Sequence, residues 1–205
     1  FCLSYKKFLK LNKKIKYDVL IKSKLFNGYM NYSELVIPGK SKKEIIISSY
    51  ICHPSMANNE ISGPIVTLAI SKYFLKLKPY YSLRFIFVPE TIGAISYINK
   101  NLNKMRANIV GGYVLTCIGD NRNYSYLSSK YDNSLSDIVA YETFKKLKIK
   151  FKKYSFLKRG SDERQYNSPG VNLPIGSIMR TKYGEYPEYH TSLDDFNVVN
   201  LKGLT

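Results

Sequence analysis

The stretch from residue 44 to residue 51 constrains the fold more than any other part of this sequence. It contains Ile45-Ile46-Ile47-Ser48-Ser49-Tyr50-Ile51, a near-continuous apolar and β-branched run. Because the run lacks the alternation of a half-exposed strand, it predicts a central strand that is buried on both faces. Such a strand needs helices on each side of its sheet.

The chain after residue 44 alternates between strand-like and helical patterns. This alternation predicts an α/β fold with a mixed, mostly parallel central sheet flanked by helices. Ser62-Gly63-Pro64 marks one helix start, since Pro is favoured at the first helical position. Further strands are expected at 83–88, 109–118, 151–156 and 171–179, helices at 62–77, 92–105, 132–147 and from residue 200, and loops at 52–63 and 161–170.

The region before residue 44 is interpreted as a separate piece of structure. Residues 1–43 are expected to form a partial β-rich element, inserted or at a sheet edge, with strands at 17–21 and 33–37, and residues 44–205 form the main domain. The chain starts at Phe1 and stops inside a new apolar segment, so we interpret it as a fragment of a longer chain. No signal peptide and no membrane span are evident, which predicts a soluble protein without a membrane partner.

The formal net charge of +17 raises the hypothesis of a nucleic-acid partner. However, only six of the 32 basic residues are arginine, the side chain that usually reads bases and phosphates through paired hydrogen bonds. The many Lys, Asn, Ile and Tyr residues are typical of A/T-rich coding. We therefore expect no nucleic-acid partner; the opposite interpretation requires binding that weakens steeply with salt.

The three cysteines, Cys2, Cys52 and Cys117, form neither a paired framework nor a CxxC motif. A sparse and odd set of this kind favours a reducing compartment and predicts a cytoplasmic protein without disulfides. Cys52 and Cys117 end apolar runs, where a small buried side chain is the ordinary role. Cys52 adjoins His53, but neighbours on a strand point to opposite faces, which disfavours a Cys–His catalytic pair.

Polar residues that can perform chemistry follow several of the predicted strands. His53, Glu90, Asp120 and His190 all come after such strands, the last by a longer loop. Loops at the carboxyl ends of the strands of an open α/β sheet meet at the ligand crevice. Imidazole and carboxylate groups are the ligands of catalytic zinc, so this pattern indicates a metal site.

Four motifs carry a resemblance to a known family. These motifs are Cys52-His53-Pro54-Ser55-Met56-Ala57-Asn58-Asn59-Glu60-Ile61-Ser62-Gly63, Phe87-Val88-Pro89-Glu90-Thr91-Ile92-Gly93, Gly160-Ser161-Asp162-Glu163-Arg164-Gln165-Tyr166, and Tyr189-His190-Thr191 with Asp194-Asp195. In this order, over roughly residues 17–201, they resemble the zinc aminopeptidase family with co-catalytic metals, peptidase family 28 type. They are most similar to its bacterial aminopeptidase-like branch, which is associated with polysaccharide biosynthesis.

The resemblance implies a zinc-exopeptidase-like fold and a role for each matching residue. His53 and His190 match metal ligands, Glu90 matches the general base, and Asp162 matches a carboxylate at the metal site. A protein of this kind hydrolyses an amide near a free amino terminus, so the expected partner is a small peptide or an aminoacyl or amide-bearing substrate. Arg164, Arg180 and Tyr189 are further candidates for substrate binding, Arg164 and Arg180 as anchors for a carboxylate.

Three departures from the family pattern argue for one zinc ion in place of two. Asn59 stands where the family has its bridging Asp, and a neutral amide is a poorer zinc ligand. Thr91 and Thr116 replace two further acidic residues. Glu60 is a possible substitute for the bridge, and Asp120 for the acidic residue at position 116. The alternative hypothesis is a catalytically degenerate, aminopeptidase-like binding protein that serves polysaccharide biosynthesis.

Structural explanations remain open for several of these residues. Glu90 is compatible with a carboxylate at a helix N-terminus. Asp162 and Glu163 are compatible with a surface ion-pair cluster with neighbouring arginines. Asp194 and Asp195 are expected to cap the turn that follows them.

Overall fold

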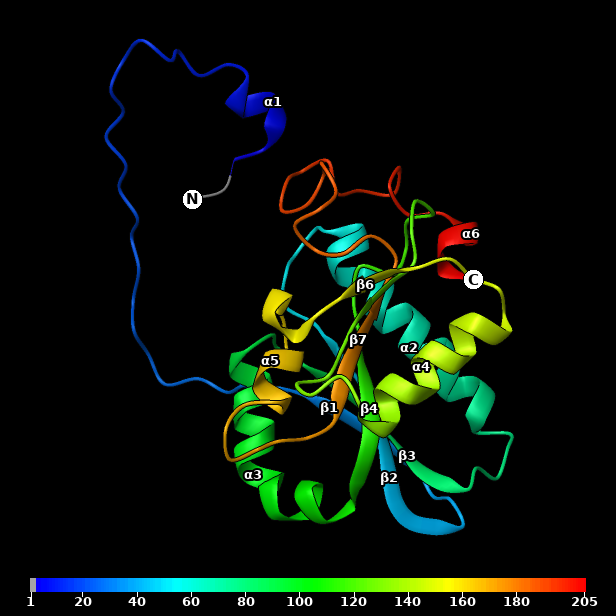
Figure 1. Cartoon of the computed structure of the whole chain (residues 1–205). Coiled ribbons are helices and arrows are strands. Elements are labelled where there is room, and N and C mark those ends of the chain that lie inside the picture. The colour runs from blue at the N-terminus through cyan, green and yellow to red at the C-terminus, as the bar shows by residue number, and fades with distance from the viewer. Residues whose placement is uncertain (1–2) are drawn as a thin grey trace.

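The computed structural model describes residues 3–205, and within this range seven strands form one sheet (Figure 1). The sheet order is β1-β3-β2-β4-β7-β5-β6. The pairs β3–β2, β2–β4, β4–β7 and β5–β6 are parallel, whereas β1–β3 and β5–β7 are antiparallel. This confirms the predicted mixed, mostly parallel sheet. The strands are β1 (Ser33–Ile37), β2 (Ser41–Tyr50), β3 (Tyr81–Val88), β4 (Ile109–Leu115), β5 (Ser125–Leu127), β6 (Lys152–Tyr154) and β7 (Ile175–Met179).

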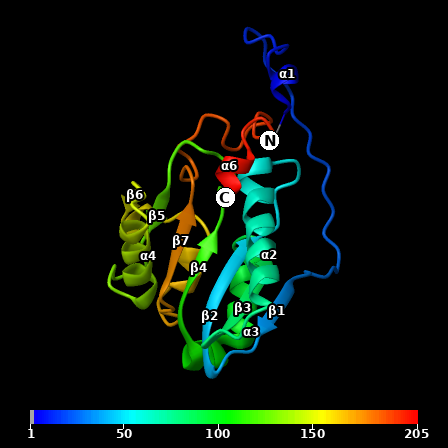
Figure 2. The same ribbon diagram turned by 90° about the vertical axis from the view of Figure 1, so that its right-hand side faces the viewer.

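Helices cover both faces of the sheet, with α3 and α5 on one side and α2 and α4 on the other (Figures 1 and 2). Helix α4 begins with a capping box, in which the side chains of Ser134 and Asp137 each accept the other's backbone N–H. The helices are α1 (Tyr5–Phe8), the π-helical turn η1 (Ala57–Ile61), α2 (Ser62–Phe74), α3 (Ile92–Asn108), α4 (Leu135–Lys146), the 3-10 turn η2 (Phe156–Lys158), α5 (Glu163–Tyr166) and α6 (Leu201–Leu204).

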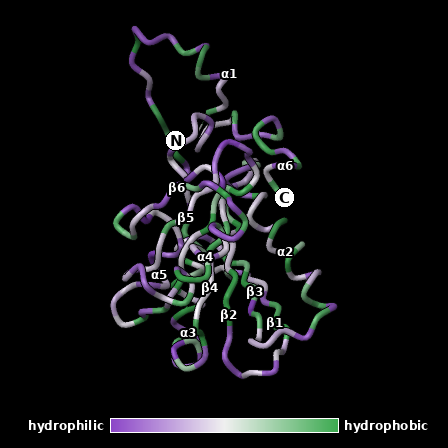
Figure 3. Tube along the Cα trace, turned by 45° about the vertical axis from the view of Figure 1, so that its right-hand side comes forward, coloured by the Kyte–Doolittle hydropathy of each residue, from purple (hydrophilic) through white to green (hydrophobic). Residues whose placement is uncertain are grey.

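Strand β2 is the buried centre that the isoleucine run predicts. Ile46 belongs to the core under α3, and the next residue, Ile47, belongs to the core under α2. Their exposed fractions are 0% and 8%. The hydropathy of β2 changes from hydrophilic at its lysine-rich start to hydrophobic beyond it (Figure 3). Both faces of β2 are therefore covered, as in other α/β sheets.

A buried charge cluster ties the edge strand β1 to the centre of the sheet. The Arg84 guanidinium on β3 donates to both carboxylate oxygens of Glu44 on β2, at 2.5 and 2.9 Å. The same guanidinium lies 2.8 Å from a carboxylate oxygen of Glu34 on β1. Arg84 is 4% exposed, so the pair is screened little by solvent. The cluster links three adjacent strands through side chains as well as through their backbones.

Several expected element bounds are wrong. Residues 17–21 form no strand, and their side chains are exposed in the extended N-terminal segment that leaves the sheet (Figure 1). The last strand begins at Ile175 and not at residue 171, because Asn172 adopts a positive φ of 49° and Pro174 has no N–H to donate. Strand β4 stops at Leu115, before Cys117 with its φ of 47°. The turn η1 lies within the expected loop at 52–63, and the short strand β5 lies in a stretch for which no element was expected.

Helix and strand limits differ from expectation by a few residues elsewhere. Helix α2 ends at Phe74, α3 continues to Asn108, and α4 begins at Leu135. Helix ends are the least reliable part of any pattern-based prediction, because caps and tertiary contacts decide them. Among residues 3–205, no helix combines the length and the apolar character that crossing a bilayer requires.

Candidate metal centre and active site

The two histidines of the chain meet at the carboxyl edge of the parallel strands. His53 follows the end of β2, and His190 lies in the loop region after β7. The centroids of their rings are 5.0 Å apart. The Tyr189 ring stacks on His190 at 4.0 Å, so Tyr189 belongs to the same site. The pKa of His190 is lowered by burial and then by the proximity of His53, which favours a neutral imidazole that is able to bind a cation.

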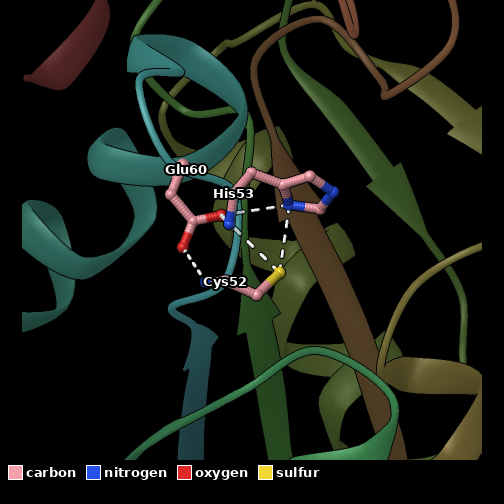
Figure 4. A group of neighbouring side chains, drawn as sticks. All are labelled: Cys52, His53 and Glu60. Atoms are coloured by element: carbon pink, nitrogen blue, oxygen red, sulfur yellow. Dashed lines mark hydrogen bonds and ion pairs between the residues drawn. The ribbon is translucent and has the colours of Figure 1, made fainter. Parts of the chain in front are cut away.

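His53 lies within a cluster of side chains that come from the loop after β2 and from η1 (Figure 4). Its Nδ1 is 3.2 Å from Glu60 Oε2 and 3.0 Å from Cys52 Sγ. The Asn59 side-chain nitrogen lies 3.4 Å from the same Nδ1. Glu60 also accepts the backbone N–H groups of Cys52 and His53. One carboxylate thus determines the path of the loop and faces the imidazole.

The expectation that Cys52 and His53 point to opposite faces is wrong. Strand β2 ends at Tyr50, so the strand alternation does not extend to these two residues. The Cys52 side chain is exposed, whereas Cys117 is fully buried, and burial raises its pKa to about 12. Cys117 therefore has the small buried role expected from the sequence.

A second group of side chains places Glu90 and Asp162 side by side. Glu90 Oε1 accepts a hydrogen bond from Ser161 Oγ at 2.7 Å. Asp162 Oδ1 accepts the backbone N–H of Thr91 at 2.8 Å, and Thr91 has a left-handed φ of 63°. Asp162 is fully buried, and its Oδ2 has no hydrogen-bond partner among the described residues. Burial raises the pKa of Asp162 to about 7, with a smaller contribution from the charge of Glu90.

The interpretation of Asp162 and Glu163 as a surface ion-pair cluster is wrong, because both side chains are 0% exposed. Glu163 accepts the backbone N–H groups of Gly160 and Ser161 and the hydroxyl groups of Tyr183 and Ser177. It holds the loop that carries Ser161 and Asp162. The sequence singles out Glu163 only as part of a motif and shows nothing of these partners.

Asp194, which is far from the η1 turn in the sequence, holds that turn through direct hydrogen bonds. Its carboxylate accepts the backbone N–H groups of Asn58 and Asn59 at 2.6 and 3.0 Å, and the Tyr186 hydroxyl at 2.9 Å. The expectation that Asp194 caps the turn after it is wrong; Asp195 has that role and accepts the backbone N–H of Asn197 at 2.8 Å.

Asp120 lies in a separate buried network. Its two oxygens accept the backbone N–H and the hydroxyl of Thr181, the backbone N–H of Arg122, and the Asn58 side-chain amide. No hydrogen bond joins Asp120 to His53 or to His190 within residues 3–205. Thr116, the residue for which Asp120 was expected to substitute, hydrogen-bonds with the Tyr50 hydroxyl. Neither position brings a free carboxylate to the histidines.

The two arginines proposed for substrate binding are not in contact with the histidine pair. Arg164 is exposed on α5. Arg180 is 4% exposed and stacks on the Tyr124 ring at 3.7 Å. It lines a cavity of 330 Å³ between α2, α4 and α6, and the lining of this cavity includes neither histidine. Of the three side chains proposed to bind substrate, only Tyr189 touches one of the histidines.

The chain is similar to proteins that are described as aminopeptidase-like or as peptidases. A candidate polysaccharide biosynthesis protein with an aminopeptidase-like domain, from Clostridium acetobutylicum, is 41% identical over 188 residues, which are 92% of this chain and 43% of the relative. The crystal structure of a candidate peptidase from the same organism superposes with a TM-score of 0.81 at 40% identity, covering 84% of this chain and 40% of that one. This chain thus spans less than half the length of these relatives.

More distant structures share the fold alone. An aminopeptidase from Aneurinibacillus sp. strain AM-1 is 18% identical with a TM-score of 0.72, over 84% of this chain and 44% of that one. A zinc aminopeptidase from Bacillus subtilis is 14% identical, also with a TM-score of 0.72, over 84% and 46%. The zinc-aminopeptidase-like fold expected from the motifs is therefore confirmed. Residues 15–205 match the family described as a domain of unknown function, DUF4910, and the chain belongs to that family.

Proposed function

We propose that this chain is a zinc-dependent hydrolase of aminopeptidase type that cleaves an amide near a free amino terminus. The observation that carries the proposal is the 5.0 Å separation of the His53 and His190 rings at the carboxyl edge of the sheet. Glu90 and Asp162 lie near the same edge, and their charges act on His190 and on Cys52 respectively. The shared fold with zinc aminopeptidases supports the assignment.

The side chains present have the donor atoms that a zinc ion needs; among the described residues, Cys52, His53 and Glu60 bring their donor atoms within 4.8 Å of one another, and His190 joins them only after a side-chain movement. Two imidazoles and a carboxylate are a usual protein ligand set for catalytic zinc. Asp162 adds a buried oxygen, Oδ2, that has no hydrogen-bond partner among residues 3–205. A buried polar atom without a partner is costly, and a cation is one way to satisfy it. We propose His53 and His190 as ligands of one zinc ion, with a carboxylate as a third ligand, and we leave Asp120 out of this set.

The chain's own residues have distinct roles in the proposed reaction. When bound, a zinc ion polarises a substrate carbonyl and makes water easier to deprotonate. Glu90 Oε1 is held by Ser161, which leaves Oε2 able to take a proton from water and return it to the leaving amine. Thr91 anchors Asp162 through its backbone N–H and keeps the Glu90 loop against the Asp162 loop. Tyr189 supports His190 by ring stacking.

Replacement of Glu90 by Gln tests the proposal. The purified chain, loaded with zinc, is assayed against a panel of aminoacyl amides, and its zinc content is measured by mass spectrometry. We expect Glu90→Gln to retain zinc and to lose activity by about 10²–10⁴-fold, which is the contribution of general-base catalysis. Combined replacement of His53 and His190 by Ala is expected to abolish zinc binding. Full activity of the Glu90 variant, or no zinc in the unaltered chain, contradicts the proposal.

A second candidate function rests on Asn59. Its amide stands in the family's bridging-Asp position and lies 3.4 Å from His53 Nδ1, where it adds no negative charge. This favours a binding protein without catalysis, in the setting of polysaccharide biosynthesis that the Clostridium relative's description mentions. Asn59→Asp distinguishes the two functions: a hydrolase should gain zinc affinity by about tenfold or more and gain activity. A binding protein should gain neither.

A further inference from the structure

We propose that the thiolate of Cys52 and the carboxylate of Glu60 bind the same cation as His53 Nδ1, so that this chain has a sulfur-containing metal centre. The proposal rests on the proposed function, because it adds ligands to the ion assigned there, which then takes water or substrate as a fifth ligand. It assigns two ligands that the family motifs do not assign.

The three donor atoms form a triangle with sides of a length that a single metal ion can bridge. Cys52 Sγ to His53 Nδ1 is 3.0 Å, His53 Nδ1 to Glu60 Oε2 is 3.2 Å, and Cys52 Sγ to Glu60 Oε2 is 3.9 Å (Figure 4). Zinc bonds to sulfur, nitrogen and oxygen in a tetrahedron separate neighbouring ligand atoms by about 3.4–3.6 Å. The observed separations differ from these by no more than about 0.6 Å. One ion can therefore contact all three atoms after small side-chain movements.

The backbone around the triangle is already organised. Glu60 accepts the N–H groups of both Cys52 and His53, so its carboxylate is held against the loop that carries the other two donors. Asp194 accepts the N–H groups of Asn58 and Asn59 and thereby holds the η1 turn from which Glu60 projects. Binding of a cation therefore requires little further ordering of the loop after β2 or of the η1 turn.

The charge around Cys52 also favours a cation. Three carboxylates, those of Glu60, Glu90 and Asp162, lie near the thiol, and Oε2 of Glu60 is 3.9 Å from Cys52 Sγ. Among residues 3–205, the only salt-bridge partner of these three carboxylates is His53, at 3.2 Å from Glu60. A divalent cation would offset this negative charge and replace the thiol proton, which passes to solvent.

The sequence change at positions 59 and 60 becomes meaningful in this arrangement. The zinc aminopeptidase family that the motifs resemble has a bridging Asp where this chain has Asn59, and the carboxylate of this chain is one residue further along, at Glu60. The longer side chain of Glu60 brings that carboxylate back to His53. The loss of Asp at position 59 is thus accompanied by a carboxylate at position 60 that contacts the same imidazole.

A different arrangement uses the same contacts. In this second arrangement Glu60 accepts a hydrogen bond from His53 Nδ1 and orients the ring without touching the cation. The cation binds the other ring nitrogen, Nε2, as in many zinc sites that contain a carboxylate–histidine pair. In that arrangement Cys52 is not a ligand. The two arrangements differ in whether sulfur touches the cation.

Cobalt(II) spectroscopy decides between them, because a thiolate ligand gives an intense near-ultraviolet charge-transfer band that nitrogen and oxygen ligands do not. The metal-free chain is titrated with Co²⁺. We expect the band in the unaltered chain and its loss in Cys52→Ser, while Co²⁺ still binds through the remaining ligands. Glu60→Gln is expected to keep the band and to weaken Co²⁺ binding by about tenfold or more. Cys117→Ser, at the buried cysteine, serves as the control and should keep the band.

Each other outcome overturns the inference. Co²⁺ bound without the band means that Cys52 is not a ligand, and only this inference fails. A band that survives in Cys52→Ser assigns the sulfur elsewhere and also contradicts it. Unchanged Co²⁺ affinity in Glu60→Gln removes Glu60 from the ligand set. No Co²⁺ binding at all removes the proposed function as well.

Discussion

Asp194 and Asn59 are joined across 135 residues of sequence by a buried hydrogen bond, in which Asp194 Oδ2 accepts the Asn59 backbone N–H at 3.0 Å. The segment after His190 is therefore attached to the turn that carries Asn59 and Glu60. This carboxylate is one of the contacts that fix the relative position of the two histidine-bearing regions, together with the hydrogen bond from Ala57 N–H to the Asp194 carbonyl.

Replacement of Asp194 by Asn should weaken the whole site. The variant loses a charged acceptor for two backbone N–H groups, and a buried group left unsatisfied costs about 1–3 kcal/mol. We expect the free energy of unfolding to fall by that amount, and zinc affinity to fall with it, measured by urea unfolding and by metal titration. Asp195→Asn is the matched control, since Asp195 is exposed and should change stability by less than about 0.5 kcal/mol. Equal effects of the two variants would contradict this role.

Thr91 stores backbone strain next to Glu90. A β-branched residue at a φ of 63° costs on the order of 1–3 kcal/mol, and Gly adopts this conformation freely. Thr91→Gly is therefore expected to leave stability unchanged or to raise it by up to about 1 kcal/mol. Thr143→Gly, in the exposed part of α4, should lower stability by about 0.3 kcal/mol, the difference between the helix propensities of the two residues. Thermal unfolding of the two variants checks the prediction, and it fails if both are destabilised alike.

Asp137 gives the protein an acid-dependent part of its stability. Burial tends to raise its pKa, but hydrogen bonds from the hydroxyl and backbone N–H groups of Ser129 and Ser134 outweigh burial and lower it. A carboxyl whose folded pKa lies below its unfolded value of about 3.9 contributes stability that is fully present above that value. The contribution disappears as the pH falls through the folded pKa.

Asp137→Asn should consequently destabilise the chain at pH 7 by about 1–3 kcal/mol, because an amide cannot accept from all of these donors. The difference from the unaltered chain should shrink steadily as the pH falls below about 4. Urea unfolding at a series of pH values measures it. A difference that stays constant with pH would show that the charge of Asp137 is not what matters.

The Arg84–Glu44 pair should be costly to break and less costly to remove. Arg84→Met leaves Glu44 buried without its partner, and this typically costs about 3–5 kcal/mol. The double variant Arg84→Met with Glu44→Leu is expected to recover part of that loss, since apolar pairs replace buried ion pairs with little penalty. A double-mutant cycle by chemical denaturation supplies the test. The double variant should not be less stable than Arg84→Met alone.

The positions of the main strands could be predicted because burial leaves a mark on the residues themselves. The isoleucines of β2 are covered by helices on both faces, so apolar residues occupy three consecutive positions in place of an apolar–polar alternation, and this run is visible in the sequence. Short elements were harder to predict. The three-residue strand β5 and the turn η1 depend on distant partners, and their own residues carry little periodicity.

The candidate site also has one part that the sequence predicts and another that depends on distant partners. The sequence by itself determined that two imidazoles and Glu90 follow the ends of parallel strands, because strand order and direction carry such residues to one edge of the sheet. Only the tertiary structure decided that Cys52 and Glu60 face His53, that Asp194 holds η1, and that Asp120 and Arg180 lie elsewhere. The physical reason is that side-chain direction in loops follows no period. It is set by hydrogen bonds between residues that are far apart in the chain.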